Sequence, residues 1–69
     1  MSKVRRKGYS LTVSDSGEAA YLYLPTHPAK SGCCKKTVEL RKHLEDYKGP
    51  DLILDLDESG EIIGIEVLY

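Results

Sequence analysis

The fold is decided by residues 52–68, which read LILDLDESGEIIGIEVL. Leucine recurs at every second position before the central acidic and glycine residues, and isoleucine or valine does so after them. A period of two is typical of a strand with one buried face, and Glu58-Ser59-Gly60 is typical of a turn. Residues 52–68 therefore predict a β-hairpin that forms the centre of the core.

The length of the turn decides which side chains share a face in this hairpin. A loop of two or four residues puts Leu54 on the same face as Ile63 or Ile65, and a three-residue loop does so only if a bulge restores the register. We expect the apolar residues of both strands to form one stripe beneath one side of a sheet.

Residues 9–24 predict a second hairpin. Apolar and polar residues alternate in both of its halves, and turn-forming residues separate the halves at positions 15–17. In the second half Tyr21 and Tyr23 share one face, because side chains two apart in a strand point the same way. Pro25 ends this strand, since proline cannot donate a hydrogen bond to a sheet.

The next segment carries a mixed signal. Residues 36–40 are typical of a short strand, whereas apolar residues from Leu40 to Tyr47 recur at helical spacing with charges between them. We expect a strand near 36–40 followed by a short helix at 41–47. A single helix over 37–47 is the alternative.

The expected fold class is α+β: a small antiparallel β-sheet of four to five strands, built from two hairpins, with one short helix. The 69 residues leave room for one domain, so we expect a basic flexible N-terminal arm at residues 1–8 and a single β-rich domain at residues 9–69. A chain this small buries about 60% of the surface that its unfolded form exposes. A homodimer or a partner chain would add the buried apolar area that it lacks.

The net charge of −1 hides an asymmetry. Residues 1–36 carry seven Lys or Arg against two acidic residues, and residues 37–69 carry three against nine. Such a dipole can orient self-association or an encounter with a charged partner. No apolar run approaches the roughly 20 residues that span a bilayer, and no apolar stretch follows the basic start as in a signal peptide, so we expect a cytoplasmic protein.

One stretch has the spacing of an EF-hand calcium loop. Asp55, Asp57 and Ser59 would supply oxygen ligands at positions 1, 3 and 5, and Glu66 would close the loop at position 12. The flanking residues have the alternation of strands, whereas an EF-hand needs helices there. In an extended strand Glu66 would lie roughly 20 Å from the turn, so a calcium site is a minor alternative.

A zinc site is a second minor alternative. His27, Cys33, Cys34 and His43 are residue types that bind zinc. Zinc sites use cysteine pairs separated by two to four residues, and adjacent cysteines in an extended chain point apart. We therefore interpret the two cysteines as reduced loop thiols.

Single-stranded nucleic-acid binding is the principal alternative to a protein-interaction role. Basic residues near the N-terminus and two tyrosines on one strand face make the combination of cationic arm and aromatic platform that binds single strands. These residues are Lys3, Arg5, Arg6, Lys7, Tyr21 and Tyr23. The acidic C-terminal half opposes this role, because it would repel phosphates.

No sequence pattern indicates catalysis or a cofactor. The chain has no nucleophile elbow, no phosphate-binding glycine loop and no dinucleotide fingerprint, so we expect a non-enzymatic protein without a cofactor. A sheet of four or five strands with one short helix leaves part of one face apolar, and an exposed apolar patch marks an association surface. The leading hypothesis is a protein-interaction module that self-associates or docks onto a small partner protein.

The order of these signals resembles the domain of unknown function 2283 family. The resemblance covers residues 9–68 and is carried by AAYLYL at 19–24, TVEL at 37–40 and the closing stretch 52–68. It implies a small β-rich domain and favours the hairpin over the calcium loop. It implies no activity and, at most, an antitoxin-like role beside a small protein.

Overall fold

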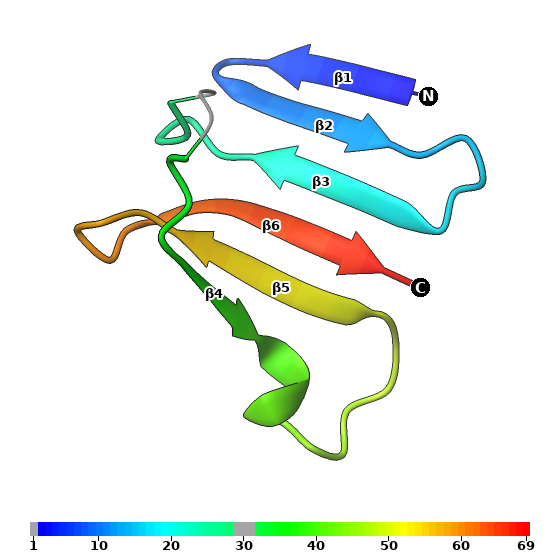
Figure 1. Cartoon of the computed structure of the whole chain (residues 1–69). Coiled ribbons are helices and arrows are strands. Elements are labelled where there is room, and N and C mark those ends of the chain that lie inside the picture. Colours follow the sequence, from blue (N-terminus) through cyan, green and yellow to red (C-terminus); the bar gives the residue numbers. More distant parts are fainter. Residues whose placement is uncertain (1, 29–31) are drawn as a thin grey trace.

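The computed structural model describes residues 2–28 and 32–69, which form one six-stranded antiparallel sheet (Figure 1). The strands are β1 (Ser2–Arg6), β2 (Tyr9–Val13), β3 (Ala19–Tyr23), β4 (Lys36–Glu39), β5 (Asp51–Leu56) and β6 (Ile62–Leu68), in the spatial order β1-β2-β3-β6-β5-β4. The pairs β2–β3 and β5–β6 confirm the hairpins predicted at 9–24 and 52–68. The strand predicted near 36–40 is β4.

A bulge in β6 sets the register of the β5–β6 hairpin. Leu54 lies opposite Ile65, and one residue of β6, Ile63, is then skipped before pairing resumes. The prediction that Leu54 and Ile65 share a face is confirmed. Ile63 is wholly buried, and its carbonyl oxygen accepts a hydrogen bond of 3.0 Å from the backbone N–H of Leu24. This bond ties the end of β3 to the bulge.

Most of the segment predicted as a flexible arm is strand β1. The turn Lys7-Gly8 joins β1 to β2, and its two residues have positive φ angles of 49° and 88°. A type I′ turn requires this combination, and its twist matches that of the flanking strands. Gly8 adopts a positive φ without steric cost. Charged side chains along β1 suit an edge strand, because they discourage pairing with other chains.

The predicted α+β class is wrong: the sheet has six strands, not four to five, and the described residues contain no α-helix. A 3-10 turn, η1 (Leu40–Lys42), replaces the short helix predicted at 41–47, and β4 excludes the alternative of one helix through this region. An isolated helix of this length cannot offset the cost of its nucleation. Instead, the guanidinium of Arg41 lies 4.6 Å from the centre of the Tyr47 ring, and its Nε donates to Asp51 at 2.6 Å.

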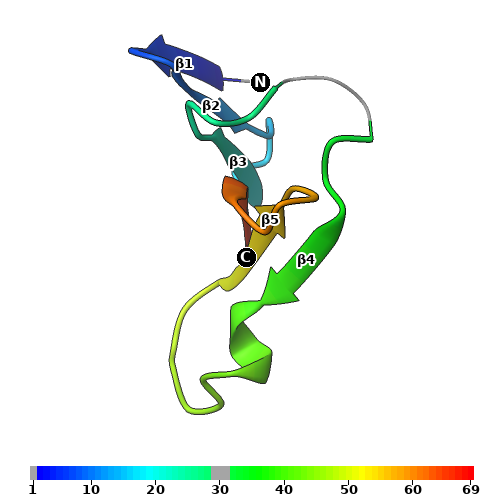
Figure 2. The ribbon, with the colours of Figure 1, turned by 90° about the vertical axis from the view of Figure 1, so that its left-hand side faces the viewer.

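Strand alternation gives the sheet one apolar and one polar face. Because cross-strand neighbours share a face, the registers assign the strand residues to one face or the other. The aliphatic residues of the apolar face are Val4, Leu11, Val13, Ala20, Leu22, Val38, Leu52, Leu54, Leu56, Ile65 and Val67. The polar face includes Lys3, Arg5, Ser10, Thr12, Tyr21, Tyr23, Thr37, Glu39, Asp55 and Glu66. Figure 2 shows the described strands as a single layer.

The molecule is a flat slab of 32 × 31 × 20 Å with little interior. Among the described residues, Ile63 and Gly64 alone are buried. The accessible surface is 5212 Å², whereas a compact protein of 7.7 kDa exposes about 4300 Å². No helix within the described ranges is long and apolar enough to cross a membrane.

The contribution of this small interior to stability can be measured at the bulge residue Ile63. Replacing Ile63 by alanine should lower the free energy of unfolding by roughly 2–5 kcal/mol, because the side chain is fully buried. The neighbouring Ile62 is 40% exposed and is the matched control, for which alanine should cost about 1 kcal/mol or less. Urea unfolding followed by circular dichroism measures both losses. Equal losses of unfolding free energy in the two variants would contradict the burial of Ile63.

Candidate functional site

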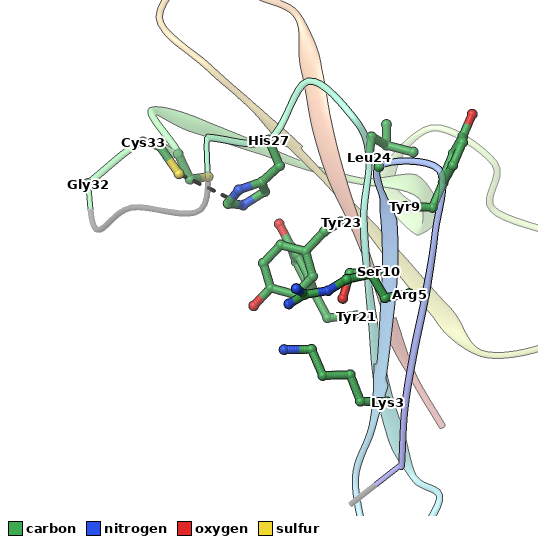
Figure 3. A pocket seen from close by; sticks show the side chains of 12 residues that line it. Lys3, Arg5, Tyr9, Ser10, Tyr21, Tyr23, Leu24, His27, Gly32 and Cys33 are labelled. Atoms are coloured by element: carbon green, nitrogen blue, oxygen red, sulfur yellow. Dashed lines mark hydrogen bonds between the residues drawn. The ribbon is translucent and has the colours of Figure 1, made fainter.

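The described ends of the β3–β4 connection carry side chains over the polar face, where an open pocket lies between them and the strands β1–β3 (Figure 3). Its volume is about 750 Å³, within the range of pockets that hold small molecules. Cations of β1, a hydroxyl of β2, rings of β3 and side chains of the connection line it. They include Lys3, Arg5, Ser10, Tyr21, Tyr23, His27, Cys33 and Cys34.

Two rows of side chains cross the pocket from β1 to β3. Arg5 lies opposite Ser10, and Ser10 lies opposite Tyr23; Lys3 and Tyr21 stand at the two ends of the neighbouring row. Figure 3 shows both cations and both rings on the same side of the sheet. Each row therefore contains a cationic residue and an aromatic residue whose backbones lie two strand spacings apart, about 10 Å.

One hydroxyl of the pocket has no partner. The Oγ of Ser10 is buried and accepts or donates no hydrogen bond within the described residues. Buried polar atoms are nearly always paired, and an unpaired one costs about 1–3 kcal/mol. The row from Arg5 to Tyr23 therefore contains a group with unused hydrogen-bonding capacity.

Three rings pack edge to face at the other end of the pocket. The ring centres of Tyr21 and Tyr23 lie 4.6 Å apart, and those of Tyr23 and His27 lie 4.7 Å apart. Such T-shaped contacts are a preferred geometry of aromatic pairs. The Nε2 of His27 lies 3.8 Å from the Sγ of Cys33. His27 is thus held between Tyr23 and Cys33.

Tyr21 is fixed by a hydrogen bond that spans three strands. Its hydroxyl donates to Oδ2 of Asp55 at 2.6 Å, and its ring passes over Gly64 of the intervening strand β6, where a β-carbon would overlap the hydroxyl. Burial and the Asp55 carboxylate raise the pKa of the Tyr21 hydroxyl well above its usual range. The hydroxyl therefore stays protonated and remains a donor at neutral pH.

The two thiols near the pocket are free. Loss of hydration and the Asp55 carboxylate raise the pKa of the Cys34 thiol, and its Sγ donates to the carbonyl oxygen of Lys36 at 3.5 Å. Reactive cysteines have lowered pKa values. The raised pKa therefore disfavours a reactive role for Cys34.

The structure does not bring the residues of the EF-hand pattern together at one site. Asp57 lies in the β5–β6 turn, where its Oδ1 accepts hydrogen bonds from the hydroxyl and N–H of Ser59 (2.7 and 2.9 Å) and from the N–H of Glu61 (3.0 Å). Asp55 and Glu66 project from the polar face of two different strands. The hydrogen bonds in the turn, led by that of the Ser59 hydroxyl, lower the pKa of Asp57. Asp57 thus organises the turn.

Three of the four residues considered for zinc lie around the pocket. His27 and Cys33 are in contact, and Cys34 lines the same pocket. His43 ends the turn η1 and does not line it. In residues 2–28 and 32–69 no group of three or more His, Cys, Asp or Glu side chains is arranged to hold a metal ion.

The basic residues considered for nucleic-acid binding do not all lie on one face, because successive side chains of β1 point to opposite faces of the sheet. Lys3 and Arg5 join the two tyrosines at the pocket. Arg6 lies opposite Tyr9 on the other face, and Lys7 lies in the turn. Half of the basic run therefore contributes to one site with the rings.

Three residues of the site, Gly64, Ser10 and His27, were not identified from the sequence. Gly64 has a weak sequence signal, because a glycine inside a strand indicates the close approach of another group. Nothing local links Ser10 to Arg5, since their pairing depends on the turn at 7–8. The position of His27 depends on the path of the β3–β4 connection, which has no periodic pattern.

The sequence matches a known family model. The model of the family described as Protein of unknown function (DUF2283) matches residues 12–69, which confirms the resemblance drawn from the sequence. No curated protein and no solved structure matches the chain. The match includes the rings of the pocket and most of the apolar face, whereas Lys3, Arg5 and Ser10 precede it.

The close approach of Tyr21 to Gly64 can be tested by a double-mutant cycle. Gly64→Ala should lower stability by about 1–3 kcal/mol, because the added methyl displaces the ring from Asp55. Alanine is otherwise favoured over glycine inside a strand by roughly 0.5–1 kcal/mol. In a Tyr21→Ala background the same change should therefore be neutral or stabilising. Urea unfolding measures the free energies of the cycle. An equal loss of stability from Gly64→Ala with and without Tyr21 would contradict the close approach of Tyr21 to Gly64.

The role of Asp57 predicts a pH dependence. Its pKa is lowered in the folded state, so its stabilising contribution is present above the unfolded pKa and is lost as the pH falls through the folded pKa. The difference in unfolding midpoint between the natural protein and Asp57→Ala should be largest near neutral pH. It should shrink below about pH 4, the ordinary pKa of Asp. A difference that stays constant on acidification would exclude a role for the ionised carboxylate.

Proposed function

This chain belongs to the family of proteins of unknown function DUF2283, and we propose that it is a non-enzymatic protein-interaction module that pairs with a second copy of itself. The two copies pack through the apolar faces of their sheets and form a β-sandwich. The family description names no activity, so the proposal depends on the surface of the fold.

The uncovered apolar face is the observation that carries the proposal. Its aliphatic side chains come from all six strands, and none is fully buried in the single layer. The chain exposes about 900 Å² more than a compact protein of its mass, and a stable interface removes about 800 Å² from each partner. Because domains are built from packed layers, a second sheet supplies the layer that this chain lacks.

The charge distribution favours a second copy as that layer. Residues 2–13 carry four Lys or Arg and no acidic residue, whereas residues 51–69 carry six acidic residues and no basic one. A two-fold axis parallel to the strands reverses the strand order of the partner sheet. The half of each sheet formed by β1–β3 then lies over the half formed by β6, β5 and β4, which carries most of the acidic residues, and this favours the encounter of two copies. The strand carboxylates Asp51, Asp55 and Glu66 project from the outer, polar faces.

The positions of the side chains agree with this arrangement. Two sheets packed face to face lie about 10 Å apart, with strands within about 30° of parallel. Leu22 and Ile65 lie on the two central strands and would be buried at the middle of the interface. Arg6 and Lys36 lie on the edge strands, where their charged ends can reach water at the margin of the interface.

The same face offers the docking surface for a small partner protein, the antitoxin-like role considered from the sequence. Self-association is preferred because the charge distribution of the chain is complementary to itself. We assign the module to the cytoplasm, since Cys33 and Cys34 are free thiols and reducing compartments keep thiols unpaired.

Neighbouring residues of β4 provide a matched test. Val38 lies on the apolar face and Thr37 on the polar face. Val38→Asp should convert the dimer into a monomer, because it places in the interface a charge whose side chain is too short to reach water at the margin, whereas Thr37→Asp should leave the dimer intact. Sedimentation equilibrium measures the mass against the 7.7 kDa of one chain. The unfolding midpoint of the natural protein should also rise with protein concentration, as expected when dimerisation stabilises the fold.

Two results would overturn self-association. One is a natural chain that stays monomeric, with a concentration-independent midpoint, at the highest concentration that remains soluble; the apolar face would then be left to a different protein. The other is equal dissociation by Val38→Asp and Thr37→Asp. Circular dichroism of both variants checks that each retains the sheet.

A further inference from the structure

We propose that the pocket on the polar face binds a single nucleotide unit, with its base against the rings of β3 and the connection and its phosphate at the cations of β1. The pocket lies on the opposite side of the sheet from the apolar face. Binding is therefore independent of the proposed dimer, and each proposal can fail without the other.

The phosphate end is formed by Lys3 and Arg5. Both side chains project from the same face of β1 into the pocket (Figure 3), and neither forms an ion pair with another described residue. No acidic side chain is among the described residues that line the pocket. Two unpaired cations without a neighbouring acid are suited to a phosphate, which accepts charge-assisted hydrogen bonds from such groups.

The base end is formed by aromatic rings. Tyr21 is held in place by its bond to Asp55 and by Gly64 beneath it. Its ring packs against Tyr23, which in turn packs against His27. A preorganised aromatic wall favours a flat ring, because every nucleobase has a π-face that can stack.

The distance between the two ends selects the shape of the ligand. The backbones of β1 and β3 lie two strand spacings apart, about 10 Å, and a molecule that meets both the cations and the rings presents an anion at one end and a flat ring at the other. Ser10 stands between them with an unpaired hydroxyl, positioned to meet a polar group such as a sugar hydroxyl. The volume of about 750 Å³ accommodates one such unit.

The charge of the rest of the sheet limits the ligand to one unit. The hairpin β5–β6 lies beside β3 and carries six acidic residues at 51–69. A longer strand that continued across the sheet would bring further phosphates towards these carboxylates, which is unfavourable. The nucleotide can come free from solution or from the phosphorylated end of a short single strand.

The test is calorimetric titration of the natural protein with adenosine 5′-monophosphate and uridine 5′-monophosphate. Adenosine and inorganic phosphate, each lacking one end of the ligand, should bind at least about tenfold more weakly than the monophosphates. A 5′-phosphorylated trinucleotide distinguishes the two sources. Tighter binding of the mononucleotide supports free nucleotide, and equal or tighter binding of the trinucleotide supports a strand end.

Adjacent arginines of β1 provide the matched variants. Arg5→Gln should weaken binding of the monophosphates about tenfold, whereas Arg6→Gln, on the opposite face, should leave it unchanged. Tyr23→Leu should weaken binding by a similar factor through loss of stacking. Backbone amide chemical shifts of the natural protein are a second measurement that needs no variant. The amides of Ser10, Tyr23 and Cys33 should shift on titration, and those of residues 40–48, which do not line the pocket, should not.

Several outcomes would overturn this inference. They are no binding of either monophosphate, equal affinity for adenosine or for inorganic phosphate, binding of the trinucleotide without the mononucleotide, and equal losses for Arg5→Gln and Arg6→Gln. Amide shift changes confined to residues 40–48 would also overturn it.

Discussion

The pairing of β3 with β6 is the interaction on which the rest of the structure depends. It joins two hairpins that are separated in the sequence, and it sets Leu22 opposite Ile65. With this register most aliphatic side chains of both hairpins lie on one face and most polar side chains lie on the other; Ile53 and Leu68 on the polar face are exceptions. A shift by one residue would exchange the two sets on one half of the sheet and destroy both surfaces. The bulge at Ile63 and its bond to Leu24 hold this register at one end.

Much of the sheet could be predicted from the sequence because its signals are local. Alternation alone located the hairpins at 9–24 and 52–68, and it placed Tyr21 and Tyr23 together. Strand β1 was not predicted, because its charged residues mask the alternation. The prediction of a helix at 41–47 was wrong because it relied on the helical spacing of three apolar residues. The described part of the chain forms a single sheet and has no second layer against which such a helix could pack.

The site was predictable in part. Residues on one strand face can be grouped by period, so the tyrosines were identified, and Lys3 and Arg5 were identified as part of a longer basic run. Period alone, applied to β1, would have separated Arg6 from them. The contributions of Ser10 and His27 could not be predicted, since they depend on a type I′ turn with a lysine at its first position and on the path of the β3–β4 connection. The turn has lysine where a type I′ turn is usually recognised by Asn or Asp, and the path of the connection is set by tertiary contacts.

The strand order has a consequence for synthesis. β6 follows all its partners in the chain, yet it occupies the middle of the sheet. While the ribosome extends the polypeptide, the three-stranded unit β1–β3 emerges first and exposes the bare edge of β3 until residues 62–68 have been made. An open edge beside an apolar surface is a template for aggregation. Closure of the sheet therefore waits until β6 has been made, and the nascent chain is exposed to this hazard until then.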